Sequence, residues 1–500
     1  MNMTPKFAIA VLGLTLTLEA GALAQPQITN LNAGSLPRSG RLAISGSGFG
    51  SGGQVLVGGV PAWVSTWLPE RLVAYVPEEL PLGSTLVVVE ADSQQSNSVA
   101  LDVTARESNG RLRWTFEIDS QSLYYRPAQA PDGTLYIHGR SLEGGGTGRI
   151  YAIAPNGALK WIREVNGSAG VPPTAGPDNE VYVGTFSDLY RISPSGDIDW
   201  VFHGDVIQSG AAVSPEGVVY AGFEHPPEAV ALDAVTGDVL WTLSPGLSAF
   251  GTGGNETRLG RSATNGPIDR FYFWWDALAA FNTDGDHLFT TSAGNIYDHE
   301  VGIGSDGTLY SPANFESDLV ALSPWNGSVM WLANSPWLAG TSDVEVGPDD
   351  TLYFVSDGRW IDAFDPHTQS SIWRHDMFHW LRRPSLSPDG STLLAAGGGG
   401  CSSQQGCVAA FVKAFETEGG EQLWHLDLDE TWDPECFSIP WDHARVSADS
   451  RTAHLIAMVG GTCDQGDERS LVWSVDLIDR ELFGDGFESG DTSAWSETVP

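Results

Sequence analysis

The sequence predicts an all-β protein with two parts, a small N-terminal sandwich and a large ring of repeated sheets. Glycine supplies 59 of the 500 residues, well above the usual ~7%, and this excess favours a turn-rich β architecture. Short β-type runs alternate with turn signals roughly every ten residues over 26–105. From residue 111 onward, a unit with two hairpin turns recurs with a period of about 45 residues. This period predicts four strands per unit.

Residues 1–24 have the pattern of a secretory signal peptide. Lys6 supplies the positive charge, the apolar core runs over Phe7–Leu18, and Ala22-Leu23-Ala24 is a small-x-small cleavage site. The core is too short to span a bilayer, and no later stretch approaches ~18 apolar residues. We therefore expect an exported protein without a transmembrane segment, located extracellularly, in the periplasm or at the cell surface. Its mature chain would begin at Gln25, and an uncleaved N-terminal anchor is the alternative.

The chain is strongly acidic. Its 63 Asp and Glu residues outnumber 25 Lys and Arg residues, which gives a formal net charge of −38 at pH 7. A surface with this charge is repelled by phosphate backbones, which argues against nucleic-acid binding. The apolar content of 41% is that of a folded protein. We expect a monomer whose partner is a protein or a polysaccharide.

The first domain is predicted over residues 26–105. Its landmarks are Pro26-Gln27-Ile28-Thr29, Ile44-Ser45-Gly46-Ser47-Gly48-Phe49-Gly50, Val57-Gly58-Gly59-Val60-Pro61, Val73-Ala74-Tyr75-Val76-Pro77 and Ser96-Asn97-Ser98-Val99. In this order they resemble the IPT/TIG family of immunoglobulin-like domains. The resemblance implies a sandwich that serves as a spacer or an interaction module, without catalytic residues. Because no cysteine pair occurs here, the sandwich is not of the disulfide-braced type.

Two landmarks repeat through the rest of the chain. The first is a turn, usually with proline, aspartate or glycine, followed by a β run, at 130–136, 176–182, 214–220, 265–272, 304–310, 347–353, 387–393 and 447–453. The second is a β run, a turn and a closing aromatic residue, at Trp161, Trp200, Trp241, Phe289, Trp331, Trp373, Trp424 and Phe483. Such units bury their faces only against their neighbours, so the ring must close.

Eight copies of each landmark predict an eight-bladed β-propeller over 111–483, with seven blades and one aberrant unit as the alternative. An extra closing segment, Arg111-Leu112-Arg113-Trp114, precedes the first repeat. We expect this strand to complete the last blade and lock the ring. The tryptophans are expected to serve mainly in packing between blades.

The form of the repeat, clearest from Ala231-Leu232-Asp233 to Trp241, resembles the pyrroloquinoline-quinone-like (PQQ-like) β-propeller repeat family. That family includes quinone-dependent dehydrogenases and also propellers that bind no quinone and act as scaffolds. The dehydrogenases typically carry adjacent cysteines and in some members a c-type haem, but this chain has neither adjacent cysteines nor a C-x-x-C-H motif. We therefore predict a non-enzymatic binding or scaffold protein without a cofactor. A divergent quinone-dependent oxidoreductase or a polysaccharide-active enzyme is the alternative.

Three segments have side chains that suit a metal ion. Asn282–Asp286 resembles the start of a calcium loop, but it lacks the distal glutamate and coincides with a repeat turn. His375 and His379 have metal-ligand spacing only if they lie on a helix, and they follow a strand. The acidic residues over 427–435 are interpreted as a solvated loop. We expect no metal, with calcium as the candidate if one binds.

The repeat order predicts which face of the ring binds a partner. With strands A to D numbered outward from the channel, the A–B and C–D turns are short and share one face. The long B–C and D–A connections lie on the other face, and they carry aromatic and arginine side chains of the kind that anchor binding surfaces. The candidates are Tyr124, Tyr125, Arg126, Trp275, Trp337, Trp380, Arg382, Arg383, Trp432 and Trp441. The run 380–383 is a local positive spot suited to a carboxylate.

The cysteines also belong to these long connections. In an exported protein, Cys401, Cys407, Cys436 and Cys463 suggest two disulfides, and four cysteines allow three pairings. Topology favours Cys401–Cys407 and Cys436–Cys463, with a zinc site as the alternative. Residues 484–500 form a tail that resembles a short segment at the C-terminal ends of many secreted bacterial proteins, either a sorting signal or a disordered end.

Overall fold

We describe a computed structural model of the chain. It describes residues 25–106, 111–119, 126–140, 147–167, 171–185, 187–204, 210–223, 228–243, 258–261, 268–274, 278–292, 301–313, 318–334, 342, 344–377, 381, 383–397, 400–402, 406–408, 411–428, 437–438, 444–459 and 469–477. Within these residues every regular element is a β-strand, as predicted. The described residues hold no helix with the length and apolar character needed to cross a membrane.

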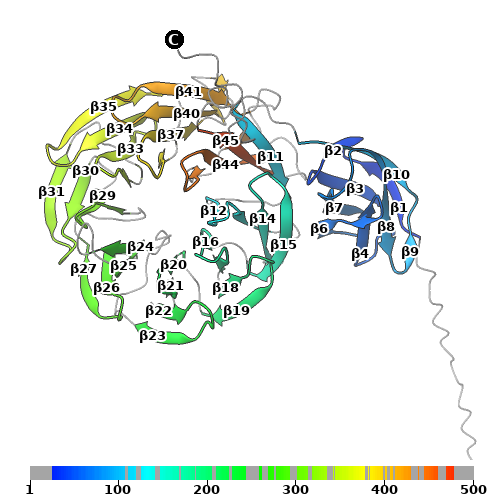
Figure 1. Cartoon of the computed structure of the whole chain (residues 1–500), viewed down its shortest axis with the longest axis horizontal. Coiled ribbons are helices and arrows are strands. Elements are labelled where there is room, and N and C mark those ends of the chain that lie inside the picture. The colour runs from blue at the N-terminus through cyan, green and yellow to red at the C-terminus, as the bar shows by residue number, and fades with distance from the viewer. Residues whose placement is uncertain are drawn as a thin grey trace, which may run out of the picture.

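The N-terminal domain is a sandwich of two sheets (Figure 1). One sheet has the order β1 (Gln27–Leu31), β3 (Arg41–Ser47), β7 (Arg71–Tyr75), β6 (Trp63–Trp67). The other has the order β2 (Ser35–Pro37), β10 (Val99–Thr104), β8 (Gly83–Ala91), β4 (Gly53–Val57), β5 (Val60–Pro61), and β9 (Gln94–Gln95) pairs with β8. Leu42, Ile44, Val55, Val87 and Val89 are fully buried between the sheets.

Gly46 of the sandwich is required because the β1 backbone and the Phe49 ring pass too close to it for a side chain. Gly46 lies where β3 passes β1, and a Cβ atom there would come within 2.0 Å of the Gln27 carbonyl oxygen and 2.4 Å of the Phe49 ring. Only a residue without a side chain fits at this spacing. The Gly-x-Gly-Phe-Gly element of the sequence therefore lets Phe49, itself fully buried, enter the core beside the strand.

A ring of sheets follows the sandwich (Figure 1). The first four are β12–β15 (Ala128–Gln129, Leu135–Arg140, Thr147–Ile153, Leu159–Asn166), β16–β19 (Thr174–Ala175, Val181–Gly184, Asp188–Ile192, Ile198–His203), β20–β23 (Ala212–Val213, Val218–Phe223, Glu228–Asp233, Val239–Leu243) and β24–β27 (Arg258–Arg261, Ile268–Trp274, Leu278–Asn282, His287–Thr291). In each, neighbouring strands pair antiparallel, in the predicted order A to D from the channel outward.

The remaining sheets of the ring continue this order. They are β28–β31 (Gly302–Ile303, Leu309–Ala313, Asp318–Leu322, Val329–Asn334), β32–β35 (Glu345–Val346, Leu352–Ser356, Trp360–Asp365, Ser370–Asp376), β36, β37, β40 and β41 (Ser385–Leu386, Thr392–Gly397, Phe411–Glu416, Gln422–Asp427), and a last sheet of β42 (Phe437–Ser438), β43 (Arg445–Val446), β44 (Thr452–Val459), β45 (Arg469–Asp476) and β11 (Leu112–Ile118). A hairpin of β38 (Gly400–Ser402) and β39 (Gly406–Val408) lies between β37 and β40. The part of the chain that the structure describes thus places eight sheets in the ring.

The ring is closed by its first strand. β11 pairs antiparallel with β45, with Thr115 opposite Trp473 and Glu117 opposite Leu471. The expectation that the leading strand completes the last sheet is therefore confirmed. Chain segments more than 350 residues apart thus hold the two ends of the ring together. The Asp476 backbone N–H also donates to the Arg111 carbonyl oxygen at 2.8 Å.

Six of the eight sheets in the described part of the chain are fastened to the next sheet through a tryptophan of the outer strand. The indole N–H donates to a carbonyl oxygen in the C–D turn of the following sheet, from Trp114 to Pro155 (2.9 Å), Trp161 to Pro194 (2.9 Å), Trp200 to Ala234 (3.1 Å), Trp241 to Thr283 (3.3 Å), Trp373 to Thr417 (2.9 Å) and Trp424 to Leu477 (3.3 Å). The same turns present glycines to the indole rings. Gly157, at φ 83°, lies so close to Trp114 that an added Cβ would be 2.8 Å from its Cγ. The expected packing role of these tryptophans is confirmed.

Candidate functional site

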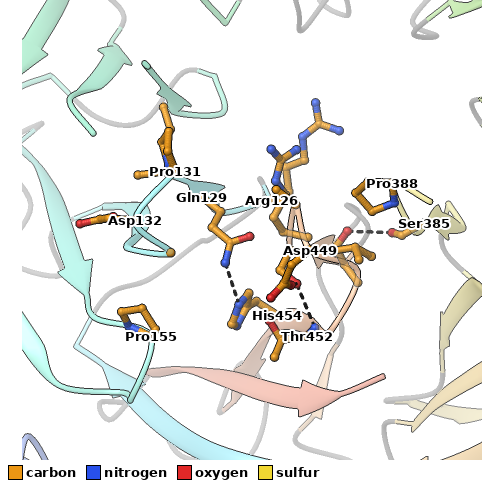
Figure 2. Close-up of a pocket in the computed structure, with 18 of the residues that line it drawn as sticks. Arg126, Gln129, Pro131, Asp132, Pro155, Ser385, Pro388, Asp449, Thr452 and His454 are labelled. Carbon is orange, nitrogen blue, oxygen red and sulfur yellow. Dashed lines mark hydrogen bonds between the residues drawn. The ribbon is translucent and has the colours of Figure 1, made fainter. Parts of the chain in front are cut away.

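A cavity of about 1020 Å³ lies along the A strands at the centre of the ring (Figure 2). Arg126, which precedes β12, belongs to the end of the A strand that receives the D–A connections. Pro131 and Gly133 belong to the A–B turn at the opposite face, so the cavity follows the channel between the two faces. The polar residues of its lining are Arg113, Arg126, Gln129, Asp132, Ser214, Glu345, Ser385, Arg445, Ser447, Asp449, Thr452 and His454.

The register of the A and B strands shows how the closing sheet departs from the repeat. The first residue of each A strand pairs with one residue of the B strand, and six sheets place a tyrosine there: Tyr136, Tyr182, Tyr220, Tyr272, Tyr310 and Tyr353. The seventh sheet has Leu394. In the closing sheet the same position is His454, which pairs with Arg445.

His454 keeps the packing contact that the tyrosines make. Tyr136 packs against Trp161 of its own sheet with ring centroids 5.7 Å apart, and His454 stacks on Trp114 at the same separation. The imidazole is only 2% exposed. Burial, followed by the charges of Arg113 and Arg445, lowers the pKa of His454 from 6.5 to about 3. The ring is therefore neutral at physiological pH, with one nitrogen that donates and one that accepts.

Gln129 is the second departure from the repeat. It is the last residue of β12, and the equivalent residues of the other A strands are all apolar: Ala175, Val213, Leu259, Ile303, Val346, Leu386 and Val446. The Gln129 amide nitrogen lies 3.4 Å from Nε2 of His454. Nδ1 of His454 has no hydrogen-bond partner among the described residues. The seam between the last and the first sheet thus carries polar groups that packing does not require.

The acidic residues that line the cavity are engaged by the fold. Asp132 accepts from the Thr134 backbone N–H (2.9 Å), and Glu345 forms an ion pair with Arg383 (3.1 Å). Asp449 accepts from the Ser447 hydroxyl at 2.5 Å. Burial raises the pKa of Asp449, but this hydrogen bond and others outweigh it, so the net shift is downward and the carboxylate stays ionised.

A second buried polar cluster joins the sandwich to the ring. Arg41 of β3 donates to Oδ1 of Asp119 at 3.1 Å, and neither side chain is more than 1% exposed. The other carboxylate oxygen of Asp119 accepts from the hydroxyls of Ser65 (3.1 Å) and Thr66 (2.5 Å) on β6. Asp119 follows β11 directly, so these side chains bind the sandwich to the end of the strand that closes the ring.

The backbone of Asp119 is satisfied as well. Its N–H donates to the Tyr75 hydroxyl (3.1 Å), and its carbonyl accepts from the Tyr151 hydroxyl (3.0 Å). Tyr75, from the sandwich, stacks on Phe116 of β11 with centroids 5.4 Å apart. Burial, together with the neighbouring Tyr151 and Asp119, raises the pKa of Tyr75, so its hydroxyl keeps its proton. Apolar packing and hydrogen bonds to both carboxylate oxygens, the N–H and the carbonyl of Asp119 therefore fix the two domains at this joint.

Two further contacts extend the joint. The Ser39 hydroxyl accepts from the Leu159 backbone N–H at 3.0 Å. Arg106, at the end of the sandwich, binds Glu78 through both terminal nitrogens (2.6 and 2.9 Å) and donates to the Asn156 carbonyl (3.0 Å). The contact between the domains therefore reaches from β11 to the C–D turn of the first sheet.

The structure describes two of the binding-face candidates. Arg126 is half-buried and lines the channel cavity. Arg383 is 7% exposed and ion-paired with Glu345, which differs from the expectation of an exposed arginine, because the carboxylate it receives belongs to the protein itself. The other candidates lie outside the described residues: Tyr124, Tyr125, Trp275, Trp337, Trp380, Arg382, Trp432 and Trp441.

The predicted disulfides are constrained only in part. In the β38–β39 hairpin, Cys401 stands directly opposite Cys407 in the backbone register. Opposed Cα atoms in antiparallel strands are ~4.5–5.5 Å apart, which a disulfide allows. Cys436 and Cys463 lie outside the described residues, and both pairings stay predictions.

The segments considered for metal binding serve the fold where they are described. Asn282–Asp286 forms a turn closed by hydrogen bonds between Asn282 and Asp286. His375 packs against Trp373 and Phe415, and His379 and most of 427–435 lie outside the described residues. Within the described part, no group of three metal-ligating side chains converges.

Sequence reasoning missed the residues of both polar clusters. His454 and Arg445 could have been found by writing the repeats in register, because a histidine then stands where six sheets have tyrosine. Gln129 would have appeared in the same way as the polar member of an apolar column. Asp119 and Arg41 carry no such signal, since they lie 78 residues apart and meet only through the tertiary fold.

These features define the class of the protein as an immunoglobulin-like sandwich joined to a β-propeller. Residues 26–105 match the IPT/TIG domain family, and residues 95–270 match the family described as outer membrane protein assembly factor BamB. The chain is a PQQ-like β-propeller repeat protein with an N-terminal IPT/TIG domain, and this prediction is confirmed.

Solved structures agree with the propeller fold. The C-terminal WD40 domain of Sif2 is 10% identical, with a TM-score of 0.52 over 74% of this chain and 99% of that chain. The Dos1 propeller is 12% identical, with a TM-score of 0.51 over 73% and 95%. BamB from Moraxella catarrhalis is 15% identical over 74% and 92%, with a TM-score of 0.34. No curated protein matches the sequence. At these identities the first two comparisons establish the fold alone.

Proposed function

We propose that the protein is an exported, envelope-associated scaffold that binds a protein or glycan partner on one face of an eight-bladed propeller. The eight sheets of the ring and their closure through β11 support this blade count. Both domains are of kinds that typically mediate interactions. The protein carries no cofactor in this proposal and catalyses no reaction.

The joint between the domains is the observation that carries the proposal. A flexible tether would need no buried ion pair, but here Arg41 and Asp119 are both withdrawn from water. Burying two charges is costly, and the cost is offset only where geometry and further hydrogen bonds are good. The result is a fixed orientation of the sandwich relative to the ring. A scaffold that presents two surfaces to one assembly requires such an orientation.

The partner would be held by the long B–C and D–A connections. The short A–B and C–D turns form the other face and are occupied by hydrogen bonds within the repeat, such as Gly133 N–H to the Ala130 carbonyl (2.9 Å). Loops that a rigid ring positions are the usual carriers of recognition. A Cys401–Cys407 disulfide would brace one of these loops.

Site-directed photo-crosslinking in the intact cell envelope tests this function. Crosslinking residues are placed at Trp337 and Trp441 in the long connections, and at Val235 and Trp325, which are 72% and 65% exposed in C–D turns. We expect discrete adducts from the first pair and none from the second. Adducts from the C–D turns alone would show that the partner binds the opposite face of the ring, which carries the short turns. The absence of any protein or glycan adduct, combined with turnover of a quinone or polysaccharide substrate by the purified chain, would contradict a scaffold role.

A further inference from the structure

The seam between the closing sheet and the first sheet concentrates polar groups that the repeat elsewhere excludes. His454 replaces a tyrosine, and Gln129 replaces an apolar residue. Arg445 is the register partner of His454, and Gln129 lies 3.4 Å from its ring. Figure 2 shows Arg126, Gln129 and His454 facing the same hollow. A ring that needed only to close would be expected to retain the repeat residues here, because the Trp114 contact already fastens the seam.

Basic and acidic side chains are equally numerous in the lining of this hollow. Its lining includes the carboxylates Asp132, Glu345 and Asp449, and Arg113 of the lining forms an ion pair with Asp476 (3.3 Å). The basic residues of the lining are Arg113, Arg126 and Arg445, and two of the lining carboxylates, Asp132 and Glu345, already form ion pairs with Lys160 and Arg383. The hollow is therefore far less acidic than the chain as a whole, whose net charge is −38. Guanidinium groups favour carboxylates through paired, charge-assisted hydrogen bonds.

We propose that the seam cavity binds a ligand that carries a single carboxylate group, held by Arg126 and Arg445, with His454 and Gln129 hydrogen-bonding the polar group next to it. Nδ1 of His454 is buried and has no partner among the described residues, so a ligand hydroxyl or amide would satisfy it. The site is independent of the loop-face partner proposed above.

Charge and volume restrict the ligand further. A polyanion would be repelled by the acidic surface, whereas one carboxylate inside the channel interacts mainly with nearby arginines, because the screening length is ~8 Å at physiological ionic strength. The volume of about 1020 Å³ suits a ligand of a few residues or sugar rings. A peptide C-terminus and a uronic acid both present a carboxylate beside an amide or hydroxyl, and this shared chemistry defines the ligand class.

Calorimetric titration of the mature chain tests the site with two pairs of probes. One pair is acetyl-Ala-Ala-Ala with a free carboxylate and the same peptide as its C-terminal amide. The other pair is methyl glucuronide and methyl glucoside. We expect one carboxylate probe to bind about tenfold or more tightly than its uncharged counterpart. The pair that shows the difference identifies the source as a peptide terminus or a sugar acid. Binding by neither carboxylate probe overturns the proposal.

Variants that restore the repeat separate binding from folding. Gln129→Ala combined with His454→Tyr gives the seam the residues Ala175 and Tyr182 of the second sheet, so folding is expected to persist. We expect this variant, and Arg445→Gln, to lose tenfold or more in affinity for the carboxylate probe. The matched control is Arg258→Gln, at the same register position of β24 in the fourth sheet. Unchanged affinity in the seam variants, or an equal loss in the control, overturns the assignment.

Discussion

The joint between the domains and the seam that closes the ring both contain buried polar residues. The central residues of the two places, Asp119 and His454, differ in how many of their polar atoms have hydrogen-bond partners. At the joint, both carboxylate oxygens, the N–H and the carbonyl of Asp119 have partners. At the seam, Nδ1 of His454 has none among the described residues. Polar groups buried for architecture are normally saturated, because an unpaired one costs ~1–3 kcal/mol. The difference between Asp119 and His454 agrees with a structural role for the joint and with the ligand proposed for the seam.

The largest effect is expected at the joint. Asp119→Ala leaves the buried Arg41 guanidinium without its counter-ion and the Ser65 and Thr66 hydroxyls without their acceptor. We expect a loss of about 3–5 kcal/mol in the free energy of unfolding, measured in urea. The control is Asp197→Ala, which removes a 3.4 Å pair with Arg163 at a site where the carboxylate is 75% exposed. Its expected cost is below ~1 kcal/mol. Equal stability of the two variants would show that the joint does not fix the domains.

Because His454 is buried at the seam, we expect it to make the free energy of unfolding depend on pH. The pKa of His454 is about 3 in the folded chain and 6.5 ordinarily, so the unfolded state binds its proton first. The contribution of neutral His454 to the free energy of unfolding is therefore fully present above pH 6.5 and is lost as pH falls towards 3. Between pH 7 and 5 we expect the wild type to lose about 2 kcal/mol more than His454→Tyr.

The groups around His454 make this comparison interpretable. Arg113 and Arg445 keep their charge over the whole range, and Asp449 has a lowered pKa. His138 is also buried with a pKa of about 3, but it is present in both proteins and cancels in the difference. Urea unfolding at pH 7, 6 and 5 measures the effect, and parallel losses in the two proteins would contradict a buried neutral imidazole.

The smallest effect on stability is expected where a turn glycine packs against a tryptophan, a contact that the seam shares with other sheets. Gly157 and Gly217 have φ of 83° and 80°, so alanine strains the backbone similarly at both positions. An added Cβ at Gly157 would lie 2.8 Å from Trp114, whereas at Gly217 the nearest atom is 4.0 Å away. We expect Gly157→Ala to cost about 1 kcal/mol or more beyond Gly217→Ala in thermal unfolding. Equal costs would mean that Trp114 can shift freely at the seam.

The repeat made much of the fold predictable. Turns with proline, aspartate or glycine indicated the A–B hairpins, and the Arg111–Trp114 segment predicted the strand that pairs with β45. Local turn chemistry and hydrophobic spacing are written in neighbouring residues, so they can be read without the tertiary fold. The strand order from the channel outward followed from the same landmarks.

The polar clusters were not predictable in the same way. Arg41 and Asp119 belong to different domains, and nothing near either residue indicates the other. Arg383 was expected to receive an external carboxylate, but the fold brings Glu345 to it from another sheet. His454 looks ordinary in its own segment and becomes notable only beside the tyrosines of six other sheets. Such contacts depend on tertiary geometry that single-sequence patterns do not encode.

The most direct test of the contrast between joint and seam is the thermal unfolding of Gln129→Ala/His454→Tyr at pH 7 without any ligand. If the seam residues are kept for binding, replacing them with repeat residues relieves unsatisfied burial and leaves Tm unchanged or higher. A Tm several degrees lower than that of the wild type would mean that His454 and Gln129 stabilise the ring themselves, and would contradict the account.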